Sequence, residues 1–131
     1  MFKVKIRDYL FIAHSLKDDF FGEAKNLHGA TYVIDLTICA DKIDEKNVVI
    51  DIGLASKILK KCISVYNYKN LDDIDKFSNV ITTTEYMSKV IVDDYIAELE
   101  RINFNTEELI SIKATLNESH IASASYKKKL K

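Results

Sequence analysis

The chain contains no proline and no tryptophan, and its 131 residues include only three glycines and two cysteines. Cys39 and Cys62 lie far apart in apolar surroundings, without the close spacing of redox or zinc motifs. We therefore expect two reduced core cysteines and no disulfide framework. Because proline is absent, no strand edge can be blocked by a residue that lacks a backbone donor.

Long apolar runs and an excess of charge of one sign are also missing. The 19 basic and 20 acidic residues give a formal net charge of −1, so no overall field attracts nucleic acid or an anionic membrane. The N-terminus has no signal-peptide core, and no apolar stretch is long enough for a membrane-spanning helix. We expect a cytoplasmic protein without nucleic-acid or membrane partners.

The residues that are present favour a folded protein of one domain. Hydrophobic residues make up 47% of the chain and charged residues 30%, as in ordinary globular domains. A chain of this length is enough for one hydrophobic core. We expect a single domain over residues 1–131.

Apolar residues that alternate with polar ones predict strands at both ends of the chain. The pattern covers residues 2–13 and 31–39 in the first part, and 110–116 in the second. A less regular strand is expected over 121–130.

Helical spacing of apolar residues indicates two helices between these strands, over 54–65 and from the threonines at 82–84 to Leu99. The order ββααββ predicts an α+β fold with both helices on one face of a four-stranded antiparallel sheet. The open edges of such a sheet need partners, so we expect several copies to associate into a β-barrel.

Six short strings carry a resemblance to a known family. FIAHSL at 11–16 and LHGATY at 27–32 resemble the strings FxAAHxL and LHGHxY of the 6-pyruvoyltetrahydropterin synthase family. Four more strings follow in the same order along the chain: VIDIGL at 49–54, YNYKNLD at 66–72, TTE at 83–85 and LNES at 116–119. They are similar to the family's VxDFGxL, LDHKNLN, PTxEN and VxET.

The resemblance implies the tunnelling fold, or T-fold, and a zinc-dependent lyase that acts on a pterin. The family includes the mammalian enzyme of tetrahydrobiopterin synthesis and the bacterial 6-carboxytetrahydropterin synthase of queuosine biosynthesis. Its members are homo-oligomers, in which two trimers form a hexamer with ligand pockets at the subunit contacts. We expect a trimer or a hexamer here.

Two of the family's three zinc-binding histidines correspond to His14 and His28. The third family position is Ala30, and a methyl group cannot bind a metal. Catalytic zinc sites use three protein ligands, so zinc would need a further donor from His120, Glu23 or a neighbouring subunit.

The family's catalytic groups are replaced as well. Ala24 stands at the position of the catalytic cysteine, and one relative uses a glutamate near that position, which leaves Glu23 as the candidate for a catalytic residue. The Asp-His pair that moves protons in the family corresponds to Asn67 and Tyr68, an amide and a phenol.

The ligand-anchoring glutamate of the family is retained as Glu118, where a carboxylate would accept hydrogen bonds from two donors on the pterin edge. Thr83 and Thr84 either line the same pocket or cap the second helix. We expect a divergent family member that binds a pterin or a related ring and acts on it. The alternatives are a non-catalytic structural or binding subunit of the same fold, and an interaction domain without a ligand.

Overall fold

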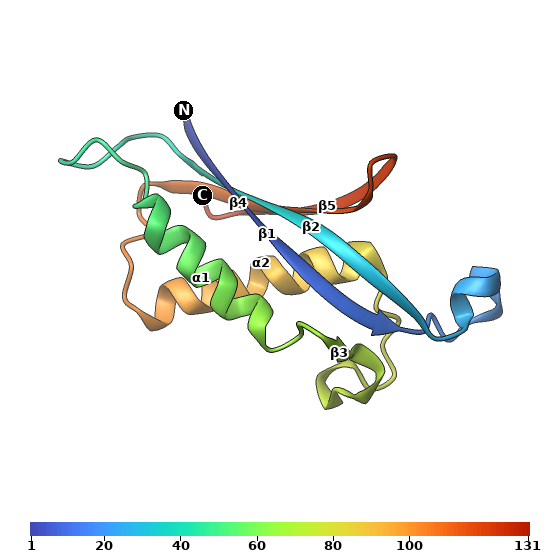
Figure 1. Cartoon of the computed structure of the whole chain (residues 1–131). Helices are drawn as coiled ribbons and strands as arrows, with labels where there is room; N and C mark the ends of the chain where they lie inside the picture. Colours follow the sequence, from blue (N-terminus) through green and yellow to red (C-terminus); the bar gives the residue numbers. More distant parts are fainter.

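One sheet carries both α-helices on the same face (Figure 1), in a computed structural model that describes residues 1–131. The strands are β1 (Phe2–His14), β2 (His28–Ala40), β3 (Lys69–Asn70), β4 (Leu109–Ser119) and β5 (Ala122–Lys129), and the helices are α1 (Ile52–Ser64) and α2 (Thr84–Arg101). Three short 3-10 helices are η1 (Asp19–Lys25), η2 (Leu71–Asp73) and η3 (Asp75–Phe77). The predicted α+β class and the order of the main elements are confirmed.

The sheet has the strand order β3-β1-β2-β4-β5, so it contains one strand more than we predicted. The four long strands are antiparallel, whereas β3 lies parallel to β1 and pairs only with Ile12 and Ala13. Two residues are too few for an alternating pattern, so β3 could not be predicted from apolar spacing. The rest of β1 and the outer side of β5 remain free edges in this chain.

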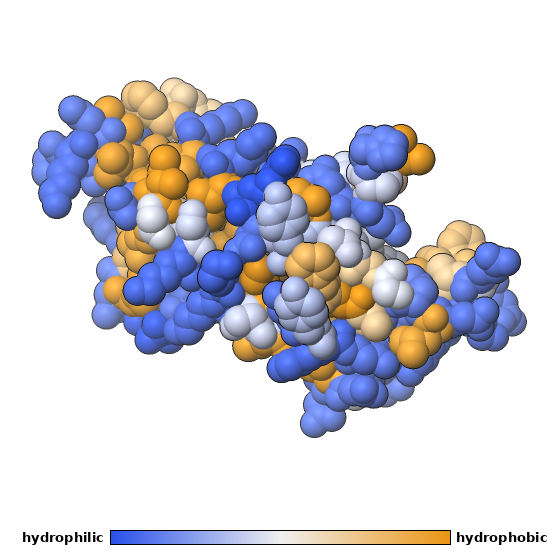
Figure 2. All heavy atoms as spheres, in the orientation of Figure 1, coloured by the Kyte–Doolittle hydropathy of each residue, from blue (hydrophilic) through white to orange (hydrophobic).

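Alternation along the strands places one side of the sheet against the helices. Leu10, Ile34 and Leu36 on this side are fully buried. Each such side chain contributes about 1.5–3 kcal/mol when it leaves water. This burial holds the helix layer on the sheet, so the sheet fixes the positions of residues at its ends. On the outer surface, by contrast, Figure 2 shows hydrophilic and hydrophobic residues side by side.

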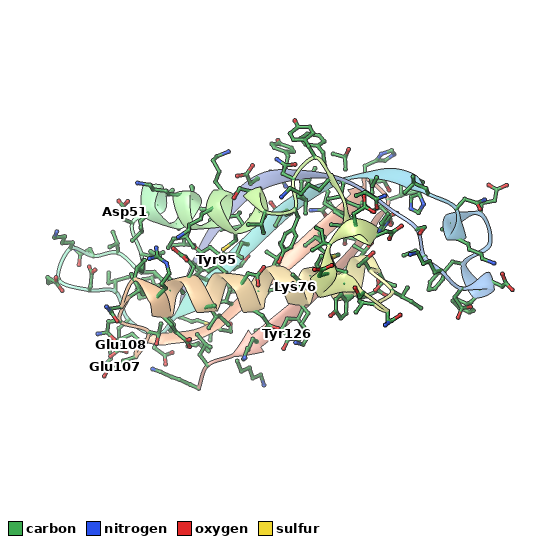
Figure 3. The ribbon with its side chains drawn as sticks, turned by 90° about the horizontal axis from the view of Figure 1, so that it is seen from below. Asp51, Lys76, Tyr95, Glu107, Glu108 and Tyr126 are labelled. Carbon is green, nitrogen blue, oxygen red and sulfur yellow. The ribbon has the colours of Figure 1, made fainter.

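Both helices begin at side chains that accept hydrogen bonds from the first turn. Asp51 accepts from the backbone N–H of Leu54 at 2.8 Å, and Thr83 accepts from that of Tyr86 at 3.1 Å. The Tyr95 hydroxyl of α2 donates to the backbone carbonyl of Ala55 in α1 at 2.9 Å, and Figure 3 shows Tyr95 between the two helices. The helices are therefore joined to each other as well as to the sheet.

Cys39 and Cys62 are free and buried, as predicted. Burial raises the pKa of Cys62 to about 12, and the nearby carboxylates of Asp94 and Glu98 act in the same direction. The thiol therefore stays protonated at neutral pH. No helix combines the length and the apolar character needed to cross a membrane.

Candidate functional site

The strands β1 and β2 bring two histidines together at one end of the sheet, near the start of α2 (Figure 1). His14 and His28 are direct partners in the β1–β2 register, with ring centroids 4.7 Å apart at an interplanar angle of 62°. The two histidines that the resemblance implies as metal ligands are therefore neighbours on adjacent strands.

Hydrogen bonds fix both imidazole rings. His14 is 3% exposed, and its Nδ1 lies 3.0 Å from Oγ1 of the buried Thr82. His28 donates from Nδ1 to the backbone carbonyl of Asn26 at 2.8 Å, because a carbonyl can only accept. Burial, and then the positive charge of His28, lower the pKa of His14, whereas the carboxylate of Asp72 acts in the opposite direction.

The donor set around the two histidines does not fit a catalytic zinc ion. Ala30 pairs with Ile12, two residues along the strands from the histidine pair, and its methyl side chain cannot bind a metal. Glu23 and His120 are exposed, in η1 and in the β4–β5 turn respectively, and no three His, Cys, Asp or Glu side chains of this chain form a group that could hold a metal. The proposed substitute ligands are therefore not brought to the histidine pair within one chain.

Ala24 and Glu23 belong to η1, which extends beyond the end of the sheet in Figure 1. The carbonyl of Ala24 accepts from the N–H of Leu16 at 3.0 Å, and that of Glu23 accepts from the N–H of Asn26 at 3.0 Å. These backbone bonds close the connection between β1 and β2. No contact of the Glu23 side chain with the histidines supports a catalytic role.

Asn67 and Tyr68 hold the edge of β1. Oδ1 of Asn67 accepts from the N–H of Phe11 at 2.9 Å, and the N–H of Tyr68 donates to the carbonyl of Phe11 at 2.6 Å. Tyr68 has a φ of 61°, which is unusual for a bulky residue, and its ring stacks on that of Phe11 at 5.2 Å. The residues that stand in place of the acid–base pair thus act as a clamp on a strand edge.

Glu118 and Thr84 lie near the buried Tyr32, which was not predicted as a site residue. Burial raises the pKa of Tyr32, the charges of Glu118 and Glu85 add to this effect, and a hydrogen bond with Thr84 opposes it. Tyr32 closes the string LHGATY, so its position in that string was the available signal. Thr83 is the N-cap of α2, and Glu118 is exposed in the single chain.

A second pair of side chains at the histidine end, Ser15 and Asp72, was also not predicted from the sequence. Ser15 follows His14, and its hydroxyl donates to Oδ2 of Asp72 at 2.5 Å while its N–H points at Oδ1 of the same carboxylate at 3.3 Å. Asp72 lies in η2, far along the chain, so spacing in the sequence could not reveal this contact.

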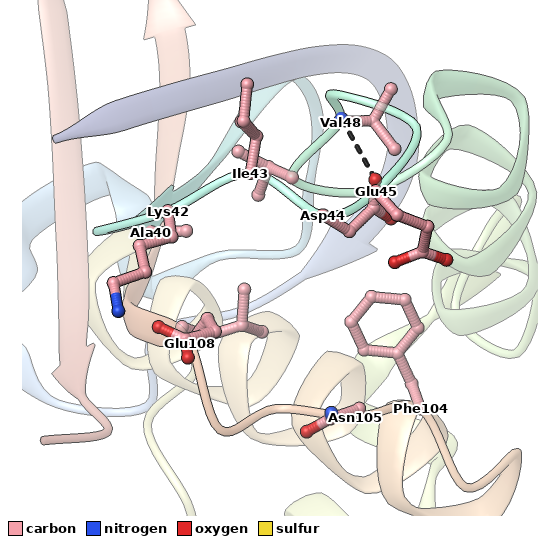
Figure 4. A pocket seen from close by; sticks show the side chains of 11 residues that line it. Ala40, Lys42, Ile43, Asp44, Glu45, Val48, Phe104, Asn105 and Glu108 are labelled. Carbon is pink, nitrogen blue, oxygen red and sulfur yellow. Dashed lines mark hydrogen bonds between the residues drawn. The ribbon is translucent and has the colours of Figure 1, made fainter.

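A pocket of about 290 Å³ lies at the other end of the sheet, between the loop after β2 and the segment after α2 (Figure 4). Its lining includes Ile43, Phe104 and Glu108, and none of the predicted site residues. The polar contacts at the histidine end come instead from β1, β2, η2 and Thr82, which lies just before α2.

The fold and the arrangement at the histidine end define an α+β protein with a polar site at the end of an antiparallel sheet. A family model described as 6-pyruvoyl tetrahydropterin synthase matches residues 3–129, so the chain belongs to this family and has its T-fold.

Individual relatives are similar at low sequence identity. The 6-carboxy-5,6,7,8-tetrahydropterin synthase of Bacillus subtilis is 24% identical over 98 residues, which are 72% of this chain and only 65% of that enzyme. The structure of Caenorhabditis elegans 6-pyruvoyl tetrahydropterin synthase matches with a TM-score of 0.80 at 19% identity, over 98% of this chain and 96% of that one. A dihydroneopterin aldolase from Burkholderia thailendensis bound to guanine matches with a TM-score of 0.54 at 8% identity, over 98% of this chain and 91% of that one.

Proposed function

We propose that the chain binds a pterin or a related 2-amino-4-oxo ring at the histidine end of the sheet, with Glu118 as its anchor. The carrying observation is that Asn117 of β4 pairs with Val33 of β2, which places the next residue, Glu118, beside β2 at the level of the buried Tyr32. The charge of Glu118 accordingly contributes to the raised pKa of Tyr32. The ring edge presents adjacent N–H donors, and a carboxylate can accept both in charge-assisted hydrogen bonds. Guanine, which the Burkholderia aldolase structure contains, presents the same kind of edge.

A neighbouring subunit completes the pocket in this proposal. Glu118 is exposed in one chain, and the carboxylate would bind more strongly if a second subunit excluded water from it. The free edges of β1 and β5 support association through the sheet, as the family resemblance implies.

Calorimetric titration with neopterin tests the anchor. Glu118→Gln replaces one acceptor by a donor that faces the ligand's own donors, so we expect a loss of about 2–4 kcal/mol, or roughly 30-fold to 1,000-fold in affinity. Glu118→Ala should lose a similar amount. Glu100→Gln, which changes an exposed carboxylate on α2, is the matched control and should bind as the wild type does.

Two results would contradict the pterin site: no binding to the wild type at millimolar neopterin, or equal binding by the Glu118 variants. Either result would favour the alternative, a non-catalytic structural subunit of the same fold.

The bound ring is not converted by the standard synthase step in this proposal. The thiol, the third metal ligand and the acid–base pair are replaced by Ala24, Ala30, Asn67 and Tyr68, and groups that act as a unit lose most of their effect when one is removed. We expect no measurable turnover of dihydroneopterin triphosphate. Turnover at the rate of an intact family member would refute this, and an unrelated reaction on the ring remains the alternative that product analysis would detect.

A further inference from the structure

The helices α1 and α2 form a groove on the side of the helix layer that faces away from the sheet. Figure 3 shows the two helices side by side over the sheet. The groove has a volume of about 580 Å³. Its apolar lining consists of Leu54, Ile58 and Ile102.

A carboxylate fixes two cations on the groove wall. The side chain of Glu98 is only 12% exposed, and it accepts from Nε of Arg101 at 2.9 Å and from Nη2 at 2.7 Å. Nζ of Lys61 donates to the same carboxylate at 2.8 Å. The guanidinium and the ammonium group are therefore held in place before any ligand arrives, and less side-chain freedom is lost on binding.

Two further lysines of the lining, Lys57 and Lys60, have no acidic partner inside the groove. Lys57 has no carboxylate within ion-pair distance, and Lys60 has only Asp8 of β1, whose Oδ2 is 3.4 Å from Nζ. The lining has four basic side chains and one acidic side chain, Glu98, and the basic ones still exceed the acidic ones by two when Asp8 is counted. Because the whole chain carries a net charge of −1, this excess is a local property of the groove.

We propose that this groove binds a small molecule with a phosphate or diphosphate group on an apolar or ring-shaped body. The two fixed cations, together with Lys57 and with Lys60, which is paired only with Asp8, suit the phosphate. The three apolar side chains suit the body. The volume is that of a small-molecule site rather than a surface for a partner protein. The groove lies in the helix layer, so it stays accessible if subunits join through the free edges of the sheet.

Titration calorimetry with inorganic pyrophosphate and with adenosine diphosphate tests the groove. The double variant Lys57→Gln/Lys60→Gln should bind both probes about tenfold more weakly, and added salt should weaken wild-type binding. The control variant Lys5→Gln/Lys113→Gln removes the same charge from exposed sites on the sheet and should leave both affinities unchanged. Glu118→Gln should leave them unchanged as well, which separates this groove from the pterin site.

Three outcomes would overturn the proposal. They are an absence of saturable binding of either probe at about 10 mM, an equal loss in the control variant, and equal affinity for pyrophosphate and adenosine diphosphate. The last result would mean that the apolar lining takes no part in recognition.

Discussion

Asn67 illustrates how a single side chain can keep a place in a fold after its chemistry has changed. Its position corresponds to the acid of a proton-moving pair in the family, but its Oδ1 here accepts from the N–H of Phe11. An amide does not act as an acid or a base near neutral pH, but its carbonyl oxygen still accepts a hydrogen bond. The site of lost chemistry is therefore still a site of structural contact.

Replacing Asn67 by alanine should destabilise the protein by about 1–2 kcal/mol, because the partly buried N–H of Phe11 loses its acceptor. Urea unfolding followed by circular dichroism measures the change. Asn67→Asp keeps an acceptor of the same shape and should stay close to the wild type at neutral pH. A loss as large in the aspartate variant as in the alanine variant would contradict the clamp.

The ion pairs of Glu98 should make the stability of the helix pair depend on pH in the acid range. Hydrogen bonds from Arg101 and then Lys61 lower the pKa of Glu98 from 4.5 to about 2. The folded protein thus holds this carboxylate ionised at pH values where the unfolded chain protonates it, so its stabilising effect is full above about pH 4.5 and falls as the pH drops to about 2.

Urea unfolding of the wild type and of Glu98→Gln at several pH values between 2 and 6 checks this expectation. The difference in stability between the two proteins should shrink as the pH falls through this window. A difference that does not change with pH would show that Glu98 acts by packing alone.

At the scale of elements, long strands and helices could be predicted and short ones could not. The strands β1, β2 and β4 and both helices repeat an apolar spacing over eight or more residues, whereas β5 is less regular. By contrast, β3 and the 3-10 helices depend on contacts with distant segments, such as that of Tyr68 with Phe11. Sequence patterns report which side of an element is buried, but not which remote segment meets its edge.

In the candidate site, too, some residues could be predicted from the sequence and others could not. The pair of His14 and His28 could be predicted because each lies at the end of a long strand, whereas Thr82, Tyr32 and the pair of Ser15 and Asp72 are placed there by tertiary folding. The roles suggested for Glu23 and for a third zinc ligand came from the resemblance, and the arrangement of this chain does not support them.

Thr83 tests whether the start of α2 serves the helix or a ligand. Its hydroxyl accepts from the N–H of Tyr86, so Thr83→Ala should cost about 1 kcal/mol of stability and Thr83→Ser should cost little. Thermal unfolding gives the stability, and neopterin titration gives the binding. If alanine abolishes binding while the fold is retained, Thr83 also belongs to the pocket.

At the scale of the whole molecule, the free edges of β1 and β5 predict association. Neither edge carries a proline, and β3 covers only two residues of β1. We expect multi-angle light scattering to give a mass that is a multiple of three subunits, as the family resemblance implies. A monomer at micromolar concentration would contradict this prediction, and with it the proposed completion of the pterin pocket by a neighbour.

The register between β1 and β2 is continuous up to its last pair, so the connection between the two strands contributes little to their pairing. Its two ends, at His14 and His28, lie opposite each other as the last pair of the ladder, so the chain leaves and re-enters the sheet at one place. The entropy of closing such a connection changes only slowly with its length. Ser15 is bonded to Asp72 of η2, but residues 16–27 could be shortened, extended or exchanged for those of a relative while the histidine pair keeps its spacing.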